Sequence, residues 1–254
     1  MRPAHRGEFR VLVAARRTGL GQVRAYLAAD ILRRLSERSR LAPTVIDLAP
    51  DGEDDLRAVC AELNIHPPRQ TLTPPVTADQ LAGLFPDGTR EPLFDVGVRV
   101  AAAEPAVERL AGYWIDVAGG ADATGGGTAR PLRQRLCVGE EPLAVRIKLM
   151  RNGYGETVGD DGDLDDADLD GEAETLARWR ELVARWARSP SGPMSRRYTD
   201  AVTAAVAGDL DTAAALRTLD ALAADPGEPD GVKFETFAAA DMLLGLDLAR
   251  QIGW

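Results

Sequence analysis

The stretch that decides the fold is GLGQVRAYLAADILRRL, which runs from Gly19 to Leu35. It follows an apolar run, Val11–Val13, and it carries an apolar stripe at helical spacing. The stripe consists of Leu27, Ile31 and Leu35. An apolar run, a glycine turn and a helical stripe are typical of a strand, a tight turn and a helix. With a further apolar segment at 44–48, residues 9–48 therefore predict a βαβ unit.

The glycine turn is the first candidate ligand site. Backbone N–H groups at the start of a helix point outward and favour an anionic group, such as a phosphate. We therefore expect ligand contacts from the residues around the turn, namely Thr18, Gly19, Gly21, Gln22 and Arg24. Glycine turns of this kind also serve packing alone, and this second interpretation stays open.

The amino-acid composition limits the classes of protein to which the chain can belong. The chain has 254 residues, 45% of them hydrophobic, which is enough for a real core. No apolar run approaches the roughly 18 residues that a bilayer requires, and the N-terminus lacks the apolar segment of a signal peptide. We therefore expect a cytoplasmic protein without membrane contact. The two cysteines, Cys60 and Cys137, predict reduced thiols rather than a disulfide framework.

The charge balance bears on the partners. The formal net charge is −10, which disfavours broad nucleic-acid binding, so tRNA is not an expected partner. Arginines nevertheless gather in two places, between Arg2 and Arg24 and again at Arg130, Arg133 and Arg135. Such groups could line a basic mouth that faces ATP or another small anionic ligand.

The remaining pattern predicts an α/β part followed by helices. Residues 51–64 predict a helix and 93–100 a strand. From residue 172 onward apolar residues recur at helical spacing. We therefore expect a Rossmann-like, parallel-sheet domain over 8–158, an acidic linker over 159–171 and a helical bundle over 172–254.

The glycine-turn stretch resembles the first signature of class I aminoacyl-tRNA synthetases, most closely the cysteinyl branch. In that family a His-Ile-Gly-His or His-Ile-Gly-Asn turn leads into Ala-Arg and a helix that ends in Asp-x-Leu-Arg-Arg. The matching residues here are Leu20, Gly21, Arg24, Asp30, Leu32, Arg33 and Arg34. Later segments resemble the family in the same order. They are Leu63–Pro68, Gly112–Ala118, Val145–Glu156, Asp209–Leu216 and Leu243–Leu246, and the helical ones also resemble the mycothiol-pathway cysteine ligases. Of these, Val145–Glu156 resembles the strand and turn that precede the second signature of the family.

The resemblance implies a class I synthetase-like sheet domain that binds ATP and an amino acid, followed by a helical bundle. It adds Trp114, Asp116 and Lys148 to the candidate ligand-binding residues. It also shows departures. Gly19 replaces the first histidine of the signature, and Val117 replaces a zinc-binding cysteine. The acidic stretch 160–163 stands where the family carries its lysine signature.

Three hypotheses follow from these observations. The chain could be a shortened relative that keeps a nucleotide or amino-acid site without normal aminoacylation. It could be a divergent ligase that forms an aminoacyl-adenylate with ATP, or a regulatory or structural partner of another protein. ATP is the only cofactor that the resemblance suggests, and no catalytic residue is assigned. His66 can be interpreted as a base or as a packing residue, and a metal at 160–170 stays open.

We predict that the purified protein carries no stoichiometric zinc. A valine at position 117 offers no lone pair, and Cys60 and Cys137 do not form a ligand pair by spacing. Elemental analysis after dialysis tests this, and about one zinc per chain would contradict it.

Overall fold

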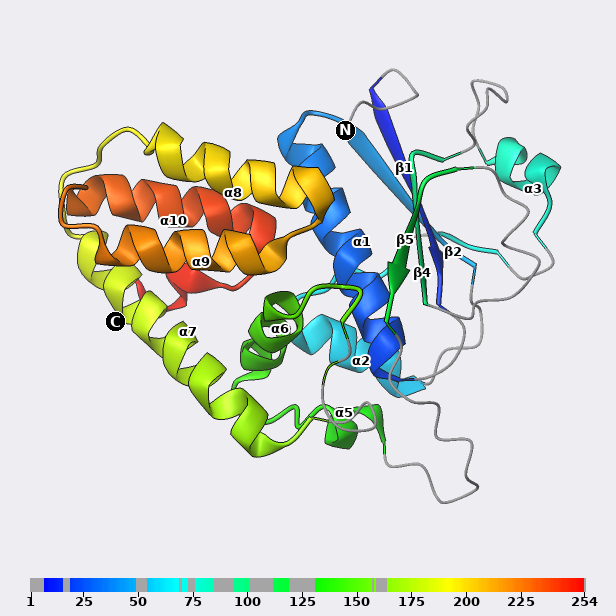
Figure 1. The fold of residues 1–254 in the computed structure, drawn as a ribbon, viewed down its shortest axis with the longest axis horizontal. Coiled ribbons are helices and arrows are strands. Elements are labelled where there is room, and N and C mark those ends of the chain that lie inside the picture. The colour runs from blue at the N-terminus through cyan, green and yellow to red at the C-terminus, as the bar shows by residue number, and fades with distance from the viewer. Residues whose placement is uncertain are drawn as a thin grey trace. The chain divides into compact units, whose positions relative to one another are not determined.

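The computed structural model of the chain is shown in Figure 1. It describes residues 7–15, 19–48, 54–68, 70–72, 76–84, 94–100, 112–118, 131–156, 158 and 164–253. The chain divides into two compact units. The sheet unit consists of Met1–Leu136 and Tyr154–Asp163, and the helical unit of Cys137–Gly153 and Leu164–Trp254.

The sheet unit is built on a five-stranded sheet in the order β3-β2-β1-β4-β5. All four strand pairs are parallel. The strands are β1 (Glu8–Ala14), β2 (Ala42–Asp47), β3 (Gln70–Thr71), β4 (Val96–Val100) and β5 (Trp114–Val117). In the centre Val11 pairs with Val45 on one side and with Val96 on the other. The expected βαβ unit and the α/β class with a helical region after it are confirmed.

The strand order changes direction at β1. The chain moves from β1 outward to β2 and β3, and then returns to the other side of β1 for β4 and β5. In open parallel sheets, ligands bind beyond the carboxyl ends of the strands at such a switch point. The carboxyl end of β1 leads to the glycine turn, so the topology places this turn where a ligand is expected.

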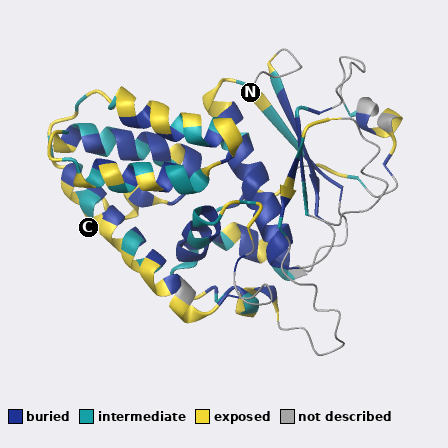
Figure 2. Ribbon diagram, in the orientation of Figure 1, coloured by how far each residue is buried: buried dark blue, intermediate teal, exposed yellow. Residues whose placement is uncertain are grey.

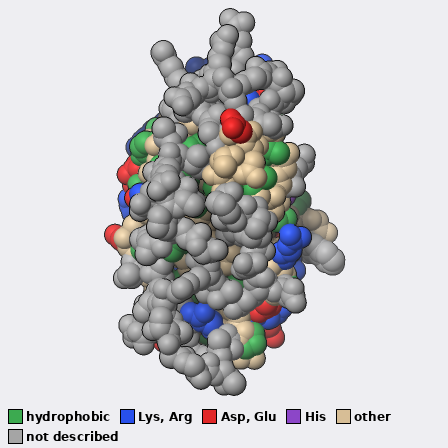
Figure 3. All heavy atoms as spheres, turned by 90° about the vertical axis from the view of Figure 1, so that its right-hand side faces the viewer, with side chains coloured by type: hydrophobic (Ala, Val, Ile, Leu, Met, Phe, Trp, Pro, Cys, Tyr) green, Lys and Arg blue, Asp and Glu red, His purple; other side chains and the backbone are tan. Residues whose placement is uncertain are grey.

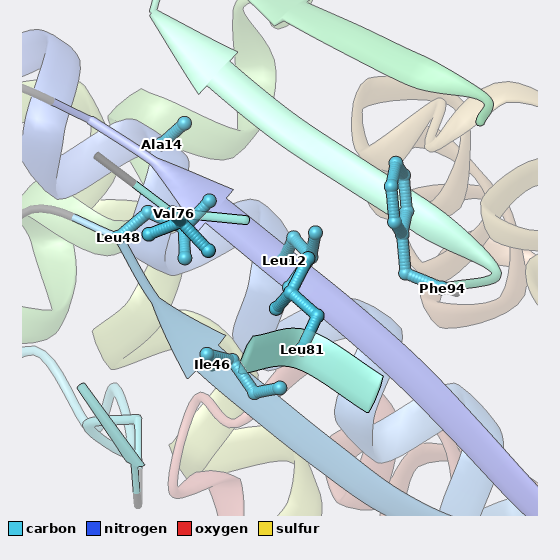
Figure 4. Close-up of a cluster of buried hydrophobic side chains, with 7 residues drawn as sticks. All are labelled: Leu12, Ala14, Ile46, Leu48, Val76, Leu81 and Phe94. Atoms are coloured by element: carbon cyan, nitrogen blue, oxygen red, sulfur yellow. The ribbon is translucent and has the colours of Figure 1, made fainter. Parts of the chain in front are cut away.

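Helix α1 (Leu20–Arg38) covers one face of the sheet, against β1, β2 and β4 (Figure 1). It is buried along most of its length, as Figure 2 shows. The other face carries the cluster drawn in Figure 4, to which α3 (Ala78–Gly83) contributes Leu81. Its members are Leu12, Ala14, Ile46, Leu48, Val76, Leu81 and Phe94. Alternate residues of β1 therefore face opposite layers, as the pleat of a strand requires.

Two further helices complete the described sheet unit. Helix α2 (Asp54–Glu62) agrees with the helix predicted over 51–64, and it packs beside α1. The short helix α5 (Leu132–Arg135) packs on α2. Its Leu132 is buried, which anchors the short helix in the unit.

The helical unit consists of five α-helices and a 3₁₀ turn in its described residues. They are α6 (Pro142–Arg151), α7 (Asp166–Trp186), α8 (Arg196–Asp209), α9 (Thr212–Ala224), α10 (Asp230–Leu244) and η1 (Leu248–Gln251). Trp179 and Trp186 of α7 meet Phe237 of α10 edge to face, with ring centroids 6.2 and 5.2 Å apart. Such pairs add to the free energy gained by burying the rings, so they fix α7 against α10.

The turn after α10 is held by three charged side chains, two of them the buried Arg146 and Arg180. Gly245 ends the helix in the left-handed conformation, with φ 69°, which favours glycine. The Asp241 carboxylate accepts hydrogen bonds from the backbone N–H groups of Leu246 and Leu248. Arg146 and Arg180 donate to backbone carbonyls of the same turn. The Leu-Leu-Gly-Leu segment therefore has a structural role in closing the bundle.

The strand that the resemblance implies at the start of Val145–Glu156 is wrong, because residues 145–151 are helical. These residues belong to α6, which begins with Pro142 in its first turn, where a proline is well tolerated. Valine, isoleucine and leucine alternate there with Arg146 and Lys148, which imitates a strand of period two. Arg146 is fully buried, however, so the segment is buried on more than one face.

This helix also changes the domain boundary. The predicted α/β domain ended at residue 158, whereas residues 137–153 pack with the helical unit. Of the predicted linker, residues 159–163 lie outside the described part of the chain. Its later residues, from Asp166, already form the first turns of α7.

In the described residues, no helix is both long and apolar enough to cross a membrane.

We predict that acid destabilises the helical unit through Asp225. Tyr198 and the Gly227 N–H donate to its carboxylate at 2.7 and 2.8 Å, and they hold its pKa below the ordinary value of 3.8. The stabilisation is complete above that value and is lost as the pH falls through the lower folded-state pKa. Urea unfolding at about pH 7 and about pH 3 should show a smaller acid effect in Asp225→Asn than in the parent chain. An equal loss in both proteins would contradict the assignment.

Candidate functional site

The glycine turn opens α1 without a side-chain cap. Gly19 has φ 149°, a conformation that other residues rarely adopt. The N–H groups of Gln22 and Val23 both donate to the Gly19 carbonyl, at 3.1 and 3.3 Å. The N–H groups of Leu20 and Gly21 come before the first hydrogen bonds of the helix, so they have no acceptor inside it. They can donate to an anion, with the positive end of the helix dipole behind them.

Gln22 is the unusual residue of this first turn. Its side chain is only 1% exposed, yet neither its amide nitrogen nor its amide oxygen meets a hydrogen-bond partner among the described residues. The amide lies near the Tyr26 hydroxyl and lowers the pKa of Tyr26, against the larger effects of burial and Asp47, which raise it. Buried amides are nearly always satisfied, so this one is a candidate contact for a ligand or a bound water.

Tyr26 and Asp47 form a buried pair one turn further along α1. The Tyr26 hydroxyl donates to the Asp47 carboxylate at 2.5 Å, and Asp47 is the last residue of β2. Burial and the neighbouring carboxylate raise the pKa of Tyr26 well above its ordinary value, so the phenol stays protonated. The pair joins α1 to the carboxyl end of β2. The glycine-turn motif does not reveal this pair, although a tyrosine on the buried helix is a usable sequence signal.

Arg24 links two segments of the sheet unit through hydrogen bonds. One of its guanidinium nitrogens, Nη1, donates to the carbonyl oxygens of Ala118, at 3.3 Å, and of Glu156. Burial lowers its pKa to about 10, and the charge of Glu156 opposes that shift. Arg24 thereby connects the first turns of α1 with the residue that follows β5.

Trp114 and Asp116 lie on β5 and are engaged with β4. Asp116 accepts from Arg99 Nε at 2.5 Å, and the Arg99 guanidinium lies 5.6 Å from the centre of the Trp114 ring. A Cβ on Gly97 would come within 2.3 Å of the same indole, so β4 needs a glycine there. The described contacts of both residues stabilise the β4–β5 edge.

The predicted ligand-binding residues therefore fall into separate groups. Gly19, Gly21, Gln22 and Arg24 share the first turns of α1, whereas Trp114 and Asp116 lie on β5. Lys148 belongs to α6 of the helical unit and is not part of this turn. Thr18 lies outside the described residues, as do Gly119–Gly127 and the acidic stretch 160–163.

His66 belongs to a different cluster. Its Nδ1 lies 3.2 Å from Asp30, and Asp30 also pairs with Arg33 and Arg34 on α1. Eleven residues of helix separate Asp30 from the glycine turn, or about 16 Å. The described contacts of His66 therefore favour the packing interpretation over a role as base at the glycine turn.

Arg135 is the residue of interest that the candidate set lacked. A Cβ built on Gly19 would lie 3.5 Å from Arg135 Nη1 and 3.9 Å from Nη2. The Arg135 guanidinium therefore borders the space that a side chain at position 19 would occupy. The cluster of arginines at 130–135 was a sequence signal for this, but only the fold shows which arginine reaches the turn.

Neither a metal site nor a charged face stands out among the described residues. No group of three or more His, Cys, Asp or Glu side chains there could hold a metal ion. On the face shown in Figure 3, basic and acidic side chains both occur, and neither kind gathers into an extended patch in the described part.

Comparison with known proteins supports the resemblance found in the sequence. No protein-family model matches the chain. It is 34% identical over 113 residues to an L-cysteine:1D-myo-inositol 2-amino-2-deoxy-alpha-D-glucopyranoside ligase from Xylanimonas cellulosilytica, and this match covers 44% of the chain. Ligases of the same name from Catenulispora acidiphila and Streptomyces griseus are 38% identical over 93 residues and 34% over 114, or 37% and 43% of the chain.

These matches cover only part of the relatives. The matched stretch spans 26%, 20% and 26% of the three ligases, respectively. The identities of 34–38% in this stretch confirm the predicted resemblance to cysteinyl-tRNA synthetase-like cysteine ligases.

We predict that Tyr26→Phe destabilises the sheet unit by about 1–3 kcal/mol, because it removes a hydrogen-bond donor from the buried Asp47 carboxylate. Tyr113→Phe is the matched control, since the Tyr113 side chain is 59% exposed. Urea unfolding followed by circular dichroism measures both variants. Equal free energies of unfolding for Tyr26→Phe and the parent chain would contradict the role of the pair.

Proposed function

We propose that the chain is a cysteine-ligase-like protein that binds the anionic part of a nucleotide-type ligand at the glycine turn of α1, without normal aminoacylation. The observation that carries this proposal is the buried Gln22 amide, which has no partner among the described residues. It lies in the same helical turn as the backbone N–H groups of Leu20 and Gly21. Ligand sites combine a few polar groups of this kind with an apolar surround.

The position of the turn supports the proposal independently. It follows the carboxyl end of β1, where the strand order changes direction. Open parallel sheets bind their ligands at this point, and helix N-termini favour phosphate. The relatives are ligases by name, so a nucleotide such as ATP is the first ligand to test.

The proposed loss of turnover depends on the residues at the turn. Gly19 has no side chain to contact a reacting phosphate group, and Val117 offers no metal ligand. Each lost contact to a transition state costs roughly 10²–10³ in rate. The described contacts of Arg24 go to backbone carbonyls, which gives it a positioning role in the free protein.

A divergent ligase is the second candidate function, and the ligase names of the relatives favour it. In that case the chain would still join an amino acid to adenylate, with other groups replacing the missing ones. Exchange of pyrophosphate into ATP distinguishes the two candidates, because only the ligase forms an adenylate.

We predict that ATP binds the purified protein in calorimetry, while L-cysteine supports no pyrophosphate exchange. Absence of binding for ATP, AMP and a non-hydrolysable cysteinyl-adenylate analogue would contradict the proposed site. Robust pyrophosphate exchange with cysteine or another amino acid would favour the divergent ligase over this proposal.

The variant Gln22→Leu gives the sharpest test of the site. It should weaken ATP binding by about tenfold, because a hydrogen bond to a ligand is lost. The same variant should keep or raise the stability of the free protein, because it removes a buried amide without a partner. Lower stability with unchanged ATP affinity would show that Gln22 serves the fold and not the ligand.

A further inference from the structure

Arg135 stands at the positive end of a helix. Its Nη1 and Nη2 lie 3.5 and 3.9 Å from the place of a Cβ on Gly19, the residue that caps α1. The N-terminus of a helix carries a partial positive charge, so a guanidinium there is repelled by it. An anion bound between the two is attracted by both.

The position of Arg135 is fixed by the neighbouring residues of α5. The backbone N–H of Arg133 donates to the Asp55 carboxylate at 3.1 Å, and the Arg133 guanidinium pairs with Glu62. Asp55 and Glu62 lie near opposite ends of α2. Together with the buried Leu132, these contacts hold the short helix on α2 and orient Arg135 toward the turn.

The other arginines near this region have different roles in the structure. Arg133 pairs with Glu62, Arg24 donates to the Ala118 and Glu156 carbonyls, and Arg99 pairs with Asp116. Among the described residues, Arg135 is thus the arginine whose guanidinium lies against Gly19 itself. A side chain larger than a methyl group at position 19 would meet this guanidinium, so the glycine and the arginine are coupled.

We propose that Arg135 is a specificity-determining residue that binds the phosphate chain of a nucleotide at the glycine turn, and that it makes the site select polyphosphates over uncharged nucleosides. This rests on the proposed function. The geometry that carries it is the short approach of the guanidinium to Gly19, the N-cap of the turn that holds the N–H groups of Leu20 and Gly21 and the buried Gln22 amide. A planar guanidinium can donate two parallel hydrogen bonds to phosphate oxygens.

Calorimetric titration of matched variants tests the inference, with ATP, AMP, adenosine and inorganic tripolyphosphate as probes. Arg135→Ala should weaken ATP and tripolyphosphate binding by about 10- to 100-fold and leave adenosine binding unchanged. Arg135→Lys should recover part of the loss, because it keeps the charge without the paired donors. The salt dependence of ATP binding should also become shallower in Arg135→Ala.

Arg38→Ala is the control for a general change of charge. Arg38 is exposed at the far end of the same helix, roughly 28 Å from Gly19 by helical rise, so this variant should bind ATP as the parent does. Circular dichroism checks that each variant is folded. If Arg135→Ala does not fold, Arg135→Gln takes its place, because it keeps most of the stem and removes the charge.

Each outcome distinguishes this inference from the proposed function. Unchanged ATP affinity in folded Arg135→Ala or Arg135→Gln would overturn the role of Arg135 and leave the glycine-turn site standing. Equal losses for ATP and adenosine would overturn it as well, because they would show a structural role. Failure of the parent protein to bind any probe would overturn the site itself and this inference with it.

Discussion

The burial of α1 is the constraint on which the sheet unit depends. A helix that packs against β1, β2 and β4 excludes water from most of its side chains, so each polar group on it must find a protein partner. Tyr26 reaches Asp47, Arg24 reaches the carbonyls after β5, and Asp30 gathers two arginines and a histidine. The exception is Gln22, whose amide has no partner in the described structure. Because the other polar groups of this buried helix have partners, the exception at Gln22 points to a functional role.

Local patterns predicted the sheet unit well, because its signals lie close together in the sequence. An apolar strand, a glycine turn and a helical stripe determine β1, α1 and β2 before any tertiary contact is known. The segment 145–150 shows the limit of this approach. Its alternation of apolar and basic residues has the period of a strand, but Arg146 is buried and donates to the Leu244 carbonyl, which lies 98 residues further along the chain. Only the packed bundle can supply that partner.

The candidate site could be predicted in part for the same reason. Gly19, Gly21 and Gln22 lie within one turn, so a sequence motif identifies them together. Arg135 comes from a helix more than a hundred residues later, and its place depends on the packing of α5 on α2. Trp114 and Asp116 were chosen by resemblance, whereas the structure shows them paired with Arg99 at the β4–β5 edge. Motifs thus identify residues that are close in sequence, but not those that only the fold brings together.

The turn after α10 has a consequence for the order in which the helical unit matures during synthesis. Arg146 and Arg180 are made early, but the carbonyls that accept their hydrogen bonds belong to residues 244–247. Arg180 already has an early partner in Glu141, at 2.5 Å, but both arginines lack these carbonyls until α10 and the turn after it have been made. The native packing of the bundle is therefore completed only when its last turn is available, and the nascent chain is exposed to chaperones and proteases until then.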